Sequence, residues 1–223
     1  RAAMSLCDAL AGRRVVMVRH GNTAKAEVDA DRRLTDKGRA QAEAFVAAFG
    51  EVLKGVANVL VSPVARTTET AEILAAPLGL RATPVEDLYF VRPWRTPEMK
   101  AADQDCGYAP VAVYIERHPG SHDAAAEAMA GGVAAAGPGL AQGDVMIVGH
   151  AGYMSFLALE VLEAMAPEPP ARETWLDAAR RVVLEANVGE VCGFEVSATG
   201  ARYLANPHGT DFAGAASNDA FVG

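Results

Sequence analysis

The chain has 223 residues, of which 51% are hydrophobic and 22% charged, enough apolar material for the core of one sizeable domain. A formal net charge of -8 excludes the generally basic surface that holds nucleic acid, so an anionic ligand would have to be bound by a local cluster of arginines. No apolar run approaches the ~20 residues that span a bilayer, and we expect neither a nucleic acid nor a membrane as partner.

The cysteines indicate a reducing compartment. Cys7, Cys106 and Cys192 are an odd number, lie far apart and lack CxxC spacing, which favours neither a disulfide framework nor a zinc site. We expect the cytoplasm, or the stroma or matrix of an organelle. The chain starts at Arg1 rather than Met, which leaves the removal of a targeting peptide open.

The first half of the chain predicts strands and helices in alternation. In chain order the predicted elements are a buried strand over 13–20, a helix capped by Thr35, a strand over 57–63, a helix over 65–76, and a third strand with its exit loop over 80–88. The helix behind Thr35 carries an apolar stripe that includes Phe45 and Phe49, which we expect in the core.

The second half opens with an irregular segment rich in Pro, Arg and aromatic residues. The predicted elements are an active-site insertion over 89–120, a helix over 122–136, a strand over 144–150, a helix over 153–165, a loop over 167–175, a β-hairpin turning near Thr199-Gly200, and a loose tail over 209–223. Alternating strands and helices favour an α/β, three-layer sandwich with a mostly parallel central sheet and helices on both faces. We expect a single domain over 1–223, with an insertion near 89–143.

Two of the predicted strands end in residues that a buried strand does not need. Arg19 and His20 end the first strand, and His150 ends the strand over 144–150. Because ligands lie outside the carboxyl ends of parallel strands, we expect these side chains to converge on one crevice. A guanidinium matches phosphate oxygens bidentately, and a neutral imidazole can attack phosphorus. Behind the pair follow residues suited to a ligand's close approach and to hydrogen bonding: Gly21, Asn22 and Thr23.

Phosphoryl transfer also needs donors for the equatorial oxygens and a proton for the leaving group. Arg66, at the junction of a strand and a helix, is a candidate second arginine. His150 is a candidate further donor. The acid could be Glu86 or Asp87, which follow the third predicted strand.

Four segments carry a resemblance to a known family: VRHGNT at 18–23, LTDKGRAQA at 34–42, SPVARTTETAEIL at 62–74 and VGHAGYM at 148–154. Their order and residues resemble the histidine phosphatase superfamily, also called the phosphoglycerate mutase-like family, over residues 13–165. The resemblance implies a catalytic mechanism without a metal or an organic cofactor. It also implies a small phosphate ester, or phosphate itself, as the ligand.

The resemblance assigns roles residue by residue. His20 would be the nucleophile that becomes phosphorylated. The phosphate pocket would comprise Arg19, Arg66 and His150, with Asn22 and Thr23 as additional contacts. For the acid, alignment of VEDLYF with the family pattern favours Asp87 over Glu86.

Three functions stay open at this point. The leading hypothesis is a phosphomonoester hydrolase that works through a phosphohistidine intermediate. A mutase of the same family is less favoured, because LYFVRPWR replaces its usual acid loop behind Asp87. A catalytically silent scaffold would usually have lost the histidine or an arginine. The substrate is not identified, although Arg92 and Arg95 around Trp94 are candidates for binding its anionic group.

The remaining histidines favour no site. His118 and His122 in HPGSH have metal-like spacing, but no third ligand follows nearby in the sequence, and we expect them at the surface. His208 is expected to be exposed in a C-terminal turn.

Overall fold

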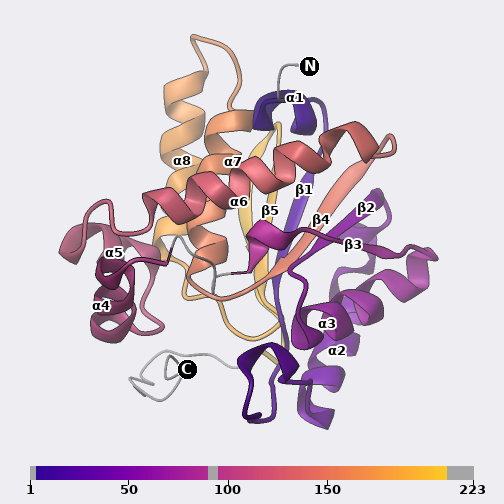
Figure 1. Ribbon diagram of the computed structural model, residues 1–223. Coiled ribbons are helices and arrows are strands. Elements are labelled where there is room, and N and C mark those ends of the chain that lie inside the picture. Colours follow the sequence, from indigo (N-terminus) through magenta and orange to yellow (C-terminus); the bar gives the residue numbers. More distant parts are fainter. Residues whose placement is uncertain (1–3, 90–94, 210–223) are drawn as a thin grey trace.

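The computed structural model (Figure 1) describes residues 4–89 and 95–209. Within these ranges one sheet has the strand order β3-β2-β4-β1-β5-β6. The strands are β1 (Val15–Arg19), β2 (Val56–Val61), β3 (Ala82–Pro84), β4 (Asp144–Gly149), β5 (Gly193–Ser197) and β6 (Gly200–Leu204). The pairs from β3 to β1 are parallel, whereas β5 and β6 add antiparallel pairs. The predicted mostly parallel sheet and late hairpin are confirmed.

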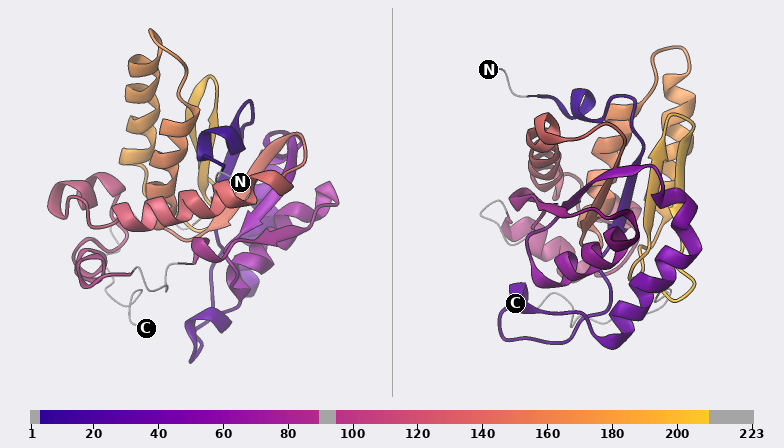
Figure 2. Two further views of the ribbon diagram at one scale, coloured as in Figure 1. Left: turned by 45° about the horizontal axis from the view of Figure 1, so that its top comes forward. Right: turned by 90° about the vertical axis from the view of Figure 1, so that its right-hand side faces the viewer.

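Helices cover both faces of this sheet (Figure 2). They are α1 (Leu6–Leu10), α2 (Asp36–Leu53), α3 (Ala65–Ala75), α4 (Pro97–Cys106), α5 (Val111–Arg117), α6 (Asp123–Ala136), α7 (Tyr153–Met165) and α8 (Arg172–Glu185). Short 3₁₀ turns are η1 (Asp29–Asp31), η2 (Ala76–Leu78), η3 (Glu86–Leu88) and η4 (Gly137–Gly139). None of the helices in the described part of the chain has the length and apolarity that a bilayer crossing requires.

Strand β1 divides its side chains between two cores, as the period of two in a strand dictates. Val15 and Met17 pack into the core beneath α6, α7 and α8, while Val16 and Val18 pack into the core beneath α2 and α3. All four side chains are fully buried. A strand buried on both faces explains why this part of the sequence is continuously apolar.

Two segments differ from the prediction. The expected irregular segment over 89–120 contains α4 and α5. Helix α4 begins where the Thr96 side chain accepts a hydrogen bond from the Met99 amide, with Pro97 in its first turn. The expected loop over 167–175 ends in the first turn of α8, because its prolines precede Arg172 and leave the helix unbroken. Arg92, Trp94 and the tail beyond residue 209 lie outside the described residues.

The predicted helix starts and turns hold elsewhere. Thr35 caps α2, since its side chain accepts a hydrogen bond from the Gly38 amide at 3.1 Å. Helix α6 continues through Gly131 and Gly132 despite their low helix propensity. The hairpin between β5 and β6 turns at residues 198–199, as expected.

Candidate active site

The carboxyl ends of β1 and β4 bring two histidines together. Parallel pairing sets Arg19 opposite Gly149, and the His20 amide then donates to the Gly149 carbonyl at 3.0 Å. His20 and His150 each follow the last residue of a strand, and their ring centroids lie 5.3 Å apart with the rings edge to face. The convergence expected from the sequence is therefore present in the fold.

One hydrogen bond fixes the tautomer of His20. Its Nδ1 lies 2.8 Å from the Gly21 carbonyl oxygen, which can only accept, so Nδ1 carries the proton. The lone pair is then on Nε2. Burial first, and then the charges of Arg19 and Arg66, lower the pKa of His20 well below 6.5. The imidazole is neutral at pH 7 and has a nucleophilic nitrogen.

His150 lies between a hydroxyl and a guanidinium. Its Nε2 is 2.9 Å from the Ser62 hydroxyl, and its Nδ1 is 3.4 Å from an Arg66 terminal nitrogen. Since a guanidinium only donates, Nδ1 accepts and Nε2–H donates to Ser62. Burial and the nearby charge of Arg66 lower the pKa of His150 well below 6.5.

Two arginines beside these histidines are almost fully buried. Arg66 is 1% exposed in the first turn of α3, and Arg19 is 4% exposed at the end of β1. Arg19 donates to the Val188 carbonyl at 2.7 Å and stacks on the Tyr108 ring, 5.1 Å from its centroid. Burial lowers the pKa of both groups, which nevertheless stay charged, as arginines in proteins do. Buried positive charge of this kind favours an anionic ligand.

A carboxylate that the sequence did not single out contacts Arg66. Asp29, in η1, accepts a hydrogen bond from Arg66 at 2.8 Å through Oδ2 and at 2.7 Å through its backbone carbonyl. The Tyr89 hydroxyl donates to the same carboxylate at 3.1 Å, and its ring lies 5.9 Å from that of His150. Burial alone would raise the pKa of Asp29, but the Arg66 charge holds it below its usual value. Burial and Asp29 together raise the pKa of Tyr89 to about 12.

Gly21 is required for packing within the protein. A Cβ at Gly21 would lie 2.7 Å from the backbone oxygen of Gly38 and 3.1 Å from its Cα. The Gly21 amide donates to Thr70 Oγ1 at 3.2 Å, and Thr70 in turn donates to the Arg66 carbonyl. The glycine was expected to make room for a ligand, whereas the atoms nearest to its missing side chain belong to α2.

Asn22 and Thr23, the expected additional phosphate contacts, have protein partners. The Asn22 side chain donates to Glu190 at 2.8 Å and accepts from the Thr35 hydroxyl at 2.8 Å. Thr23 Oγ1 accepts from Arg32 at 2.6 Å. These bonds tie the segment behind His20 to α2 and to the residues before β5.

Both candidate acids lie in η3, and both are exposed. The Asp87 side chain packs against α6: a Cβ placed on Gly132 would lie 2.8 Å from Asp87 Cβ and 3.1 Å from its Oδ2. The Tyr89 amide donates to the Glu86 carbonyl at 3.1 Å, which closes the turn. Glu86 is thus joined through its backbone to Tyr89, which contacts His150 and Asp29.

Sequence reasoning missed four residues of this site: Asp29, Tyr89, Tyr108 and Glu190. Asp29 and Arg66 are 37 positions apart, and Asn22 and Glu190 are 168 positions apart. Such pairs have no local spacing that could reveal them. A polar loop between the first strand and the capped helix was the one available signal for Asp29.

The other histidines lie in different surroundings. His208 is exposed, as expected. His122 is not at the surface, since it is 1% exposed and stacked on Phe156 with ring centroids 4.4 Å apart. Its Nε2 lies 3.2 Å from Asp103, a carboxylate that Arg95 also contacts at 3.4 Å.

Comparisons with known proteins place this geometry in a family. A model of the histidine phosphatase superfamily (branch 1) matches residues 15–191, and a search of curated proteins gives no match. Among solved structures, the chain is similar to a mycobacterial glucosyl-3-phosphoglycerate phosphatase, with a TM-score of 0.53 and 20% identity over 87% of this chain and 98% of that one. It is also similar to the alpha-ribazole phosphatase from Shigella flexneri, with a TM-score of 0.50 and 16% identity over 89% and 98%. A putative phosphohistidine phosphatase from Agrobacterium tumefaciens gives 0.46 and 21% over 82% and 89%.

Proposed function

Because the chain belongs to the histidine phosphatase superfamily, we propose that it is a phosphomonoester hydrolase that works through a phosphohistidine intermediate. The observation that carries the proposal is the state of His20. Its Nδ1–H donates to the Gly21 carbonyl at 2.8 Å, which leaves the lone pair on Nε2, in a ring that lies next to His150 and under the charges of two buried arginines. An imidazole held in this tautomer and kept neutral is ready to attack an electrophile.

The reaction has two balanced steps. In the first, His20 Nε2 forms a bond to phosphorus, the ester P–O bond breaks, and the departing alkoxide takes a proton from an acid. In the second, water attacks phosphorus and gives a proton to the conjugate base of that acid, the P–N bond breaks, and inorganic phosphate leaves with His20 neutral again. The Gly21 carbonyl holds the Nδ1 proton throughout, and its bond strengthens while the ring carries positive charge.

The arginines supply the positive charge that the transferring phosphoryl group needs. Arg19 and Arg66 are buried, where donors to an oxyanion are worth more than in water. His150 lies at the same edge of the sheet, and its one N–H, on Nε2, has to turn from the Ser62 hydroxyl to donate to the phosphoryl group. We propose that this set makes catalysis independent of a metal ion, and that the substrate is a small anionic phosphate ester.

We propose Glu86 as the acid ahead of Asp87, which reverses the preference that the sequence alignment gave. The carboxylate of Asp87 packs against Gly132, whereas the Glu86 carbonyl is hydrogen-bonded to the amide of Tyr89, a residue whose ring contacts His150. A leaving alkoxide needs this proton and nitrophenolate does not. Glu86→Gln should therefore slow alkyl phosphate hydrolysis far more than nitrophenyl phosphate hydrolysis, and Asp87→Asn should not.

Nitrophenyl phosphate turnover in excess chelator tests the proposal, with His20→Ala as the variant and His208→Ala, at an exposed histidine, as its control. We expect His20→Ala to lose essentially all turnover, His208→Ala to keep it, and the chelator to change neither. Acid-labile phosphate trapped on the protein during turnover should be absent from His20→Ala. Turnover of His20→Ala within tenfold of the unmodified chain would refute the mechanism. Phosphoryl return to a second alcohol faster than release to water would indicate a mutase.

A further inference from the structure

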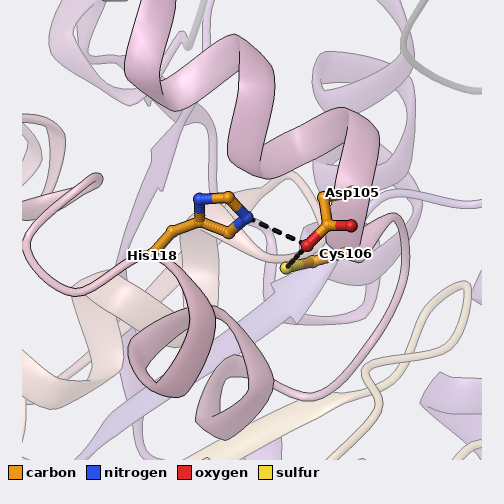
Figure 3. A group of neighbouring side chains, drawn as sticks. All are labelled: Asp105, Cys106 and His118. Atoms are coloured by element: carbon orange, nitrogen blue, oxygen red, sulfur yellow. Dashed lines mark hydrogen bonds and ion pairs between the residues drawn. The ribbon is translucent and has the colours of Figure 1, made fainter.

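A second group of chemically reactive side chains lies at the junction of α4 and α5 (Figure 3). Asp105 and Cys106 end α4, and His118 follows the last residue of α5. The Cys106 sulfur, a ring nitrogen of His118 and a carboxylate oxygen of Asp105 all lie within 4.8 Å of one another. In the sequence, no third ligand lies near His118 and His122. The fold instead brings Asp105 and Cys106 next to His118, while His122 lies in the core.

The distances between these side-chain atoms fit an ion with tetrahedral coordination. His118 Nε2 is 3.0 Å from Asp105 Oδ2, and Cys106 Sγ is 4.0 Å from the same oxygen. In a tetrahedral zinc site the bond lengths to N, O and S place nitrogen and oxygen ligands about 3.4 Å apart and sulfur and oxygen ligands about 3.6 Å apart. Each separation differs from these values by a few tenths of an ångström, so side-chain rotation is enough to form the site.

The donor set selects the metal. One thiolate, one imidazole and one carboxylate suit a borderline-soft divalent ion such as Zn²⁺, whereas Mg²⁺ and Ca²⁺ take oxygen ligands. The Cys106 residue is 8% exposed, while His118 and Asp105 have side chains 29% and 48% exposed, which gives an ion a route in from solvent. Arg117 contacts Asp105 at 3.5 Å, but both side chains are about half-exposed, and such a pair is weak enough to be displaced.

We propose that Asp105, Cys106 and His118 bind one divalent ion of the zinc class, which fastens the end of α4 to the end of α5. When the ion binds, it takes the place of the protons on Cys106 Sγ and His118 Nε2. The Cys106 thiol proton leaves to solvent, and the His118 imidazole carries its proton on Nδ1, so that Nε2 can bind the ion. The fourth position is left to water.

The position of the proposed ion connects it with the active site. The ion would join the two ends of the segment between Asp105 and His118, and this segment contains Tyr108, whose ring stacks on Arg19. Gly107, between the ligands and Tyr108, has a φ of +58°, a turn that suits glycine. Fixing both ends of this segment restricts the motion of Tyr108 against an arginine of the phosphate pocket. The ion's binding itself does not depend on the proposed phosphatase activity.

Titration of the full chain with Co²⁺, as a spectroscopic substitute for Zn²⁺, tests the site. We expect one equivalent to bind with the near-ultraviolet charge-transfer band of a cobalt thiolate, and Zn²⁺ to abolish the band by displacement. Cys106→Ser should lose the band, while Cys7→Ser, at an exposed cysteine, should keep it. His118→Gln should weaken binding roughly 100-fold, about the share of one ligand in a four-ligand zinc site, while His208→Gln should not.

Several results would overturn the proposal. A band that survives in Cys106→Ser, or no thiolate band at all, would place the ion elsewhere, with the His20–His150 pair as the obvious alternative. Because His118 is partly exposed, its variant keeps the test decisive if Cys106→Ser fails to fold. Hydrogen exchange tests whether the ion fastens α4 to α5. Zn²⁺ should slow amide exchange over residues 107–117 in the unmodified chain and not in His118→Gln. Binding without this protection would refute the fastening role.

Discussion

Two adjacent glycines in α6 allow the contact between this helix and η3, the turn proposed to carry the acid, to be perturbed with a built-in control. Gly132 is buried against η3, and a Cβ there would lie 2.8 Å from Asp87 Cβ and 3.0 Å from Val85 Cγ1. Gly131 has nothing within 4 Å of its virtual Cβ. The substitutions Gly132→Ala and Gly131→Ala are therefore chemically identical, one residue apart in the same helix, and differ in what they contact.

The contact distance sets the magnitude. Carbon atoms pack at about 3.5–4.0 Å, so η3 has to move by roughly 0.7 Å or more to accept the methyl group. Overpacking of this kind costs ~1–3 kcal/mol, against a gain of ~0.8–1.0 kcal/mol for alanine over glycine within a helix. We expect Gly131→Ala to be more stable than the unmodified chain and Gly132→Ala to be less stable by about 0–2 kcal/mol. At about 2–4 °C per kcal/mol for a chain of this size, the Tm values of the two variants should differ by roughly 2–12 °C.

The activity assay uses two leaving groups. A misplacement approaching 1 Å can cost about 100-fold in rate, so Gly132→Ala should slow alkyl phosphate hydrolysis roughly 10- to 100-fold. Nitrophenyl phosphate, whose leaving group needs no proton, should lose far less, and Gly131→Ala should match the unmodified chain on both substrates. Equal losses on the two substrates, or equal behaviour of the two variants, would refute the role of η3 as the acid-bearing turn.

Three further predictions concern the pocket itself. Arg66→Ala should weaken vanadate binding by ~1.5–3 kcal/mol, roughly 10- to 150-fold by calorimetry, because it removes charge-assisted hydrogen bonds; unchanged affinity would exclude Arg66 from the pocket. His20 and His150 have pKa values lowered well below 6.5 by burial and then by neighbouring arginines, so below pH 6.5 the unfolded chain binds their protons first. As the pH is lowered, the free energy of unfolding measured in urea should then decrease by up to ~1.4 kcal/mol per pH unit and per histidine. A free energy that stays constant between pH 7 and 5.5 would contradict the lowered pKa values. Gly21→Ala should lower the Tm by roughly 2–12 °C, because its Cβ would lie 2.7 Å from the Gly38 oxygen; an unchanged melting curve would show that α2 yields without cost.

The ends of the central strands could be predicted from the sequence because the signal there is local. Val15–Val18 is a continuous apolar run, which is typical of a strand buried on both faces, and it stops at Arg19. The topology of parallel strands then brings His20 and His150 to the same edge without knowledge of any side-chain contact. The cap at Thr35 was predictable for the same reason, since its partner Gly38 is three residues away.

Contacts between distant segments could not be predicted in this way. The pairing of Asp29 with Arg66, and of Tyr108 with Arg19, depends on how loops return to the sheet edge. The position of His122 in the core is settled by aromatic neighbours on α5 and α7, not by its own sequence surroundings. Helix α8 was missed because prolines before a helix and prolines within a loop look alike from composition.

The order of the strands has a consequence for how this protein can change. The chain leaves β1 toward the face covered by α2, and it leaves β4, the neighbour of β1, toward the face covered by α7. Two adjacent strands whose connections leave toward opposite faces of the sheet form a topological switch point, which is where ligands bind in open α/β sheets. The location of the proposed pocket is therefore set by the chain's path, and the long connection between β3 and β4 contributes neither of these two strand ends. We expect substrate preference to be changed by substitutions in that connection, without disturbing the two strand ends that hold His20 and His150.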